Sequence, residues 1–131
     1  MQQDFYKILE ITRDNVQRNP SITEAETKEV ALRYLQGIID ETDEVRPEIK
    51  EDNQVYLTDE LGDIAWDYLT ILSVLEQRGL IESAEAVFAQ AYEKYSERAP
   101  AFVEVDNDHW DQIKQAQKTR LKERHQELYG K

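Results

Sequence analysis

Two short acidic stretches, Asp40-Glu41-Thr42-Asp43-Glu44 and Asp59-Glu60-Leu61-Gly62-Asp63, decide how this chain folds. In each stretch two acids stand three residues apart, Glu41 with Glu44 and Glu60 with Asp63. Side chains three residues apart are neighbours on one face of a helix. A polar segment around Pro47 separates the stretches. The spacing therefore predicts two consecutive helices that present four carboxylates to each other.

Both acidic pairs fall on sides of their helices that also carry apolar residues. At about 100° per residue, Glu41 lies inside an apolar stripe that contains Val30, Tyr34, Ile38 and Val45. On the second helix Glu60, Asp63 and Asp67 share a sector with the side chains of Ile71 and Val74. These acids are therefore expected to point toward the core.

Carboxylates in such positions are costly without a partner. Two unit charges about 4 Å apart repel by roughly 4 kcal/mol at an effective dielectric near 20, and desolvation adds to this cost. Between Val30 and Asp63 the basic residues are Arg33, Arg46 and, in the presumed loop, Lys50. A hard divalent cation would resolve the conflict, because magnesium prefers oxygen ligands and keeps waters for a phosphate-bearing substrate.

An ordinary alternative exists for this pattern. A single Glu-x-x-Glu is most often a solvated helix face, and two such pairs on core-facing sectors of consecutive helices favour the metal site. Gly37 stands one turn before Glu41, although glycine inside a helix costs about 1 kcal/mol relative to alanine. Its presence indicates either close helix packing or room for a ligand near the acids.

Length and composition bound the class of protein. The 131 residues fit one domain, short enough for self-association to be expected. With 28 acidic and 16 basic residues the net charge is -12, which disfavours binding to a nucleic acid polymer. No run is apolar and long enough to span a membrane, and the start of the chain is not a signal peptide. The absence of cysteine is compatible with the cytoplasm, where we expect the protein.

The two histidines do not suggest a site. Both His109 and His125 stand among charged or polar residues, where a solvated role is expected. No glutamate is followed three residues later by histidine, so the Glu-x-x-His signature of di-iron bundles is missing.

The apolar spacing is helical almost throughout, and it predicts an all-α protein. We expect a first helix over residues 4–18 and a second that starts at a capping box, Ser21 to Glu24, and ends at Pro47. A third helix is expected over residues 54–78 and a fourth over residues 83–98, ending before Pro100. A last helix should start at a cap formed by Asp106 or Asn107. Residues 101–105 are predicted to be extended. We assign residues 1–118 to one domain and residues 119–131 to a charged helix end or tail.

The acidic pairs form part of a longer ordered pattern. The sequence Asp40-Glu41-x-x-Glu44, fifteen residues, then Glu60-Leu61-Gly62-Asp63 resembles the paired acidic motifs of the MazG-type nucleotide pyrophosphohydrolases, in the all-α NTP pyrophosphatase superfamily. Further on, Lys94-Tyr95-Ser96-Glu97-Arg98 is similar to the family's Lys-Phe-x-x-Arg element, and Trp110-Asp111-Gln112-Ile113-Lys114 is similar to its Trp-x-x-Ile-Lys segment. The resemblance extends over roughly residues 23–118.

This resemblance implies Mg²⁺-dependent hydrolysis of a nucleoside triphosphate to the monophosphate and pyrophosphate, in clearing or controlling the nucleotide pool, with Mn²⁺ as the alternative ion. By motif position, Glu41, Glu44, Glu60 and Asp63 would be metal ligands and catalytic residues. Lys94 and Arg98 would bind the triphosphate. The family also implies a homodimer or homotetramer in which a four-helix bundle carries the active site.

Two positions depart from the family pattern. Asp40 stands where many members have glutamate, and the angular reckoning places it off the inward sector. Glu97 stands where the family often has a second arginine, which would weaken phosphate binding. Both departures favour an alternative function, a catalytically weak nucleotide-binding or regulatory module of the same fold. A helical oligomerisation protein with solvated acids is a third hypothesis, and the inward placement of Glu41 and Glu60 argues against it.

Overall fold

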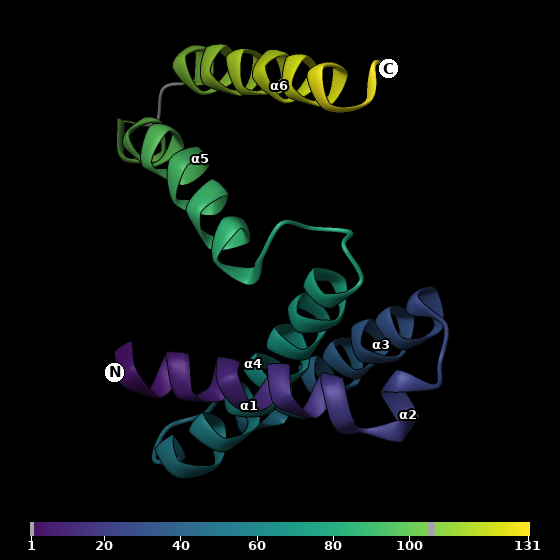
Figure 1. Cartoon of the computed structure of the whole chain (residues 1–131). Helices are drawn as coiled ribbons and strands as arrows, with labels where there is room; N and C mark the ends of the chain where they lie inside the picture. Colours follow the sequence, from purple (N-terminus) through teal and green to yellow (C-terminus); the bar gives the residue numbers. More distant parts are fainter. Residues whose placement is uncertain (1, 105–106) are drawn as a thin grey trace. The chain divides into compact units, whose positions relative to one another are not determined.

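The computed structural model describes residues 2–104 and 107–131, and these residues form six α-helices and no strand (Figure 1). The helices are α1 (Gln2–Arg18), α2 (Pro20–Thr23), α3 (Thr27–Val45), α4 (Gln54–Gln77), α5 (Ala84–Glu104) and α6 (Asn107–Tyr129), with a 3₁₀ turn, η1 (Arg46–Glu48), after α3. The all-α prediction is confirmed for this part of the chain.

The chain divides into two compact units, residues 1–84 and 85–131. In the first unit α4 packs along α3 and is crossed by α1 (Figure 1). The core between these helices contains Val16, Ile22, Val30 and Val74, each at most 1% exposed. The second half of α4 is buried continuously from Leu69 to Val74. This strong burial holds α4 in place as the central helix of the unit.

Polar contacts lock α1 onto α4. Thr12 is fully buried, and its hydroxyl lies 3.0 Å from that of Ser73 while donating to the carbonyl of Leu9. One residue along, the Arg13 guanidinium donates to both carboxylate oxygens of Glu76, at 2.9 and 2.6 Å. The buried polar groups of this contact are thus hydrogen-bonded, as burial requires.

The corner between α1 and α3 differs from the sequence prediction. Pro20 opens the short helix α2, and the side chain of Asn19 caps it by accepting from the amide of Ser21 at 3.0 Å. The capping box predicted at Ser21 is therefore wrong, and α3 begins only at Thr27. The physical reason is that asparagine before proline is itself a strong helix start.

Arg78, at the end of α4, holds this corner to the rest of the unit. Its guanidinium donates to the carbonyl oxygens of Ile22 and Ala25, at 3.0 and 3.2 Å, and to the hydroxyl of Thr27 at 2.9 Å. The next residue, Gly79, ends the helix with a φ of +76°, a conformation that glycine adopts without strain.

In the second unit the predicted extended segment is wrong. Helix α5 continues through Pro100 to Glu104, so residues 101–104 are helical, while Val105 lies outside the described residues. Proline removes one backbone hydrogen bond, but Pro100 stands in the last turns, and the following Ala101 is 3% exposed. Helix α6 then begins at Asn107 and continues without a break to Tyr129, so it includes most of residues 119–131, which were assigned to a charged helix end or tail. Asp106, the other expected cap, is not among the described residues.

None of the helices within the described residues is both long enough and apolar enough to cross a membrane.

Candidate metal centre

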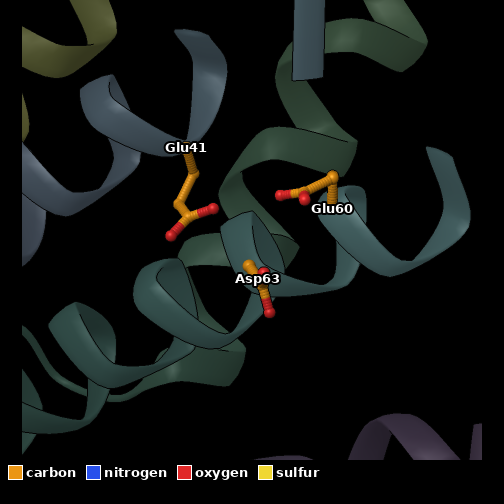
Figure 2. Close-up of side chains that lie close together, drawn as sticks. All are labelled: Glu41, Glu60 and Asp63. Atoms are coloured by element: carbon orange, nitrogen blue, oxygen red, sulfur yellow. The ribbon is translucent and has the colours of Figure 1, made fainter. Parts of the chain in front are cut away.

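Three carboxylates from two helices converge in the first unit. Figure 2 shows Glu41 on α3 facing Glu60 and Asp63, which lie about one turn apart on α4. One oxygen atom from each of these side chains lies within 4.8 Å of the others. The convergence follows from the three-residue spacing of Glu60 and Asp63 and from the close packing of α3 on α4.

Glu44, the fourth predicted ligand, borders this group at an exposed position. Its carboxyl influences both glutamates of the group. Burial of the carboxyl raises the pKa of Glu41 to about 7, with further contributions from Glu44, Asp63 and Glu60. Burial also raises the pKa of Glu60, followed by the charges of Glu44 and Asp63. The four acids therefore act on one another electrostatically.

The acidic group lacks protein partners that would compensate its charge. The Oε2 atoms of Glu41 and Glu60 are buried and accept no hydrogen bond within the described structure. The nearby arginines are engaged elsewhere, since Arg33 contacts Glu29 and the carbonyl of Ser21, and Arg46 contacts Asp43 at 3.6 Å. Orphaned buried oxygens of this kind are the donor set that a hard divalent cation takes. The residues present therefore fit a divalent metal ion.

The seam between α3 and α4 continues one turn beyond the acidic group, at Gly37 and Asp67. A Cβ atom placed on Gly37 would lie 2.7 Å from an Oδ atom of Asp67. The three atoms nearest to such a Cβ all belong to the Asp67 side chain and none to the backbone of α4. Burial, and then the charge of Asp63, raises the pKa of Asp67.

Asp40 lies outside the group, as its helical angle predicts. Its side chain is exposed, and its Oδ1 accepts a hydrogen bond from the side-chain amide of Gln36, Nε2, at 3.0 Å. The difference from the family pattern, aspartate where many members have glutamate, therefore affects a solvent-exposed contact on α3 and not the acidic group.

Lys94 and Arg98 lie one turn apart on α5, in the second unit. Arg98 Nε donates to Gln117 Oε1 on α6 at 2.6 Å, and the guanidinium lies 4.9 Å from the ring centroid of Trp110. Lys114 approaches the same ring at 5.6 Å. The structure thus gathers the carboxylates in one unit and these basic and aromatic side chains in the other.

Two residues of the second unit escaped the sequence reasoning. Gln117 is 6% exposed, and its amide donates to the Lys94 carbonyl at 3.0 Å and to Glu97 at 3.2 Å. Arg120 donates to both oxygens of Glu97, at 2.9 and 2.7 Å. These contacts, with the Arg120 hydrogen bond first, lower the pKa of Glu97. These partners are 20 or 23 residues apart, and no local sequence pattern predicts such contacts. Only the packing of α6 on α5 reveals them.

A comparison with known proteins identifies the family of the chain. The model of the MazG nucleotide pyrophosphohydrolase domain matches residues 22–103, more than half of the chain, including all four acids of the motif pairs. The searches of curated proteins and of solved structures returned no match. The family uses divalent metal, and an acidic group fit for such an ion is present. The chain belongs to the MazG nucleotide pyrophosphohydrolase family.

Proposed function

We propose that this protein is a Mg²⁺-dependent enzyme that hydrolyses a nucleoside triphosphate to the monophosphate and pyrophosphate, and so clears or controls part of the nucleotide pool. The observation that carries the proposal is the convergence of Glu41, Glu60 and Asp63. Two oxygen atoms of this group, Oε2 of Glu41 and Oε2 of Glu60, are buried and have no hydrogen-bond partner in the described structure. The family match supplies the reaction class.

In this proposal Glu41, Glu44, Glu60 and Asp63 hold Mg²⁺, with Mn²⁺ as a substitute. The bound ion supplies neutralisation of phosphate charge and acidifies water in the site. The carboxylates orient the reacting groups, and one that is not fully used as a ligand accepts the proton of the attacking water. Lys94 and Arg98 bind the triphosphate through charge-assisted hydrogen bonds.

The active form in this proposal is a homodimer or homotetramer. Large apolar side chains are exposed in both units, including Leu32, Leu35 and Ile39 on α3 and Tyr92 and Val103 on α5. A second copy of the chain would remove such surface from water.

Two contacts argue against the non-catalytic alternative. Asp40 is exposed and bonded to Gln36, so its shorter side chain does not alter the acidic group. The charge of Glu97 is matched by Arg120, so it does not act as a free negative charge beside Arg98.

The test is pyrophosphate release from a panel of ordinary and modified nucleoside triphosphates, with Mg²⁺ or with chelator. Wild type should release pyrophosphate and monophosphate only with the metal. Glu60→Gln should lower kcat/KM by more than about 100-fold, beyond the 10–100-fold effect typical of residues that only support a metal ligand. Asp40→Asn, an equal loss of charge beside the site, should behave as wild type.

Two results would contradict the proposal. If the Glu60→Gln variant hydrolysed triphosphates as fast as wild type, the role assigned to the acidic group would be excluded. If no triphosphate is hydrolysed while Mg²⁺ or nucleotide still binds, the nucleotide-binding module replaces the enzyme.

A further inference from the structure

A groove lined by basic side chains lies between α5 and α6, within the second unit. It contains about 420 Å³ of space between atoms, open solvent included. Helix α5 contributes Lys94 and Arg98, and α6 contributes Lys118, Arg120 and Arg124. Residues 85–131 hold 8 of the chain's 16 basic residues but only 9 of its 28 acidic residues. The groove is therefore a basic surface in a strongly acidic protein.

The cations of the groove differ in whether an acid already pairs with them. Arg120 is held by Glu97, at 2.7 Å, and is also influenced by the charge of Glu93. In the described part of the chain no carboxylate pairs with Lys94, Arg98, Lys118 or Arg124, whose side chains all line the groove. Glu93 also lines the groove, so these four cations share it with one acid, besides the Arg120–Glu97 pair. Like charges gathered in this way repel each other unless a further anion joins them.

A buried side chain fixes the orientation of one of these cations. Gln117 is 6% exposed and accepts from Arg98 Nε at 2.6 Å, while its amide group is bonded to Lys94 and Glu97. Because Nε is occupied, the two terminal nitrogens of Arg98 remain to bind a ligand. A guanidinium held in this way presents the paired donors that suit phosphate oxygens. The groove thus contains one buried polar side chain, Gln117, that is hydrogen-bonded to Arg98.

We propose that the α5–α6 groove binds a short chain of phosphate groups, and that Lys118 and Arg124 of α6 complete the site with Lys94 and Arg98. Several adjacent cations match an anion that carries several adjacent charges. The overall charge of -12 favours a short phosphate chain over a nucleic acid polymer. One source of such a phosphate chain is the triphosphate of the substrate, and in that case the inference rests on the proposed function. A separate polyphosphate-bearing effector is the other source of the same chemistry.

The test is calorimetric binding of inorganic tripolyphosphate to the full chain in the presence of chelator, so that neither metal nor turnover is involved. Lys118→Gln and Arg124→Gln should each weaken binding about tenfold, the scale of one charge-assisted hydrogen bond. Lys118→Arg should retain binding. Lys122→Gln is the matched control, because it removes an equal charge from an exposed position on α6 that does not line the groove.

Kinetics then separate the two sources. If the groove holds the substrate, KM for the triphosphate rises in Lys118→Gln and Arg124→Gln by a factor similar to the binding loss, with kcat little changed. If it holds an effector, binding is lost while KM stays the same. The proposal is overturned if wild type does not bind tripolyphosphate, or if Lys122→Gln loses as much affinity as the groove variants. Absent turnover with intact tripolyphosphate binding would count against the proposed function alone.

Discussion

At the scale of single residues, the acids of the candidate metal centre are expected to destabilise the metal-free protein. The pKa of Glu41 is about 7, raised by burial above its ordinary value of 4.5. Since the folded state disfavours the charged form, this carboxyl destabilises the metal-free protein increasingly as pH rises from about 4.5 through about 7. Crowding of this kind is expected at a site built for an ion.

Neutralising Glu41 should therefore stabilise the metal-free protein. We expect Glu41→Gln to raise the thermal midpoint by a few degrees at pH 8 in chelator, and to abolish the further rise that Mg²⁺ gives to wild type. Differential scanning calorimetry measures both effects, with Asp40→Asn as the exposed control. A lower midpoint for Glu41→Gln would mean that the acids do not destabilise one another.

The same carboxyl should make metal binding depend on pH. Binding requires the charged form of Glu41, so Mg²⁺ must displace the proton from the fraction of molecules that carry it. Affinity should rise with pH, by up to about tenfold per unit below pH 7, and level off above the pKa of about 7. Titration with Mg²⁺ between pH 6 and 8 measures this slope. An affinity independent of pH would show that Glu41 is not a ligand.

At the scale of secondary structure elements, the unit that carries the acids depends on the corner around α2. Arg78→Met would remove three hydrogen bonds from the end of α4 to this corner. We expect a loss of about 2 kcal/mol in unfolding free energy, because bonds to a charged group are worth more than neutral ones. Urea denaturation followed by circular dichroism measures the loss. Arg46→Met, which breaks one exposed pair with Asp43, should cost less than about 1 kcal/mol.

Sequence reasoning succeeded where spacing along one helix decides the outcome. The convergence of Glu41, Glu60 and Asp63 was predictable from their helical spacing. Glu41 and Glu60 are half-buried, but Asp63 is exposed, so the predicted core-facing position of Asp63 is wrong. It failed at Pro100, because α5 continues to Glu104 although proline in general tends to end a helix. It also missed the contact of Arg120 with Glu97, because a pairing between two helices leaves no local pattern. The neighbour of Gly37 could not be predicted from the sequence, since it depends on the position of the Asp67 side chain on another helix.

At the scale of the whole molecule, the described residues of the second unit do not form a core of their own. Among its described side chains only Ala101 and Gln117 are buried. Among the residues of this unit that the structure describes, eight large apolar side chains are exposed: Phe88, Tyr92, Tyr95, Phe102, Val103, Leu121, Leu128 and Tyr129. Two helices with so little burial gain little from the hydrophobic effect.

We therefore expect the protein to self-associate. Light scattering after gel filtration should give a mass that is a multiple of 15.4 kDa, and the thermal midpoint should rise with protein concentration. Tyr92→Glu, at an exposed apolar position on α5, should shift the mass toward the monomer, whereas Gln90→Glu adds the same charge at a polar position on that helix. A monomer whose midpoint is independent of concentration would contradict the homodimer and homotetramer alike.

The stacking of Trp110 has an optical consequence. The chain has two tryptophans, Trp66 on α4 in the first unit and Trp110 on α6 in the second. The indole of Trp110 lies against the charged groups of Arg98 and Lys114, and nearby cations polarise the ring and shift its fluorescence. With Trp66 replaced by phenylalanine, the emission of Trp110 alone would follow any change at these cations, without an attached dye. The protein thus carries an intrinsic spectroscopic reporter in its second unit.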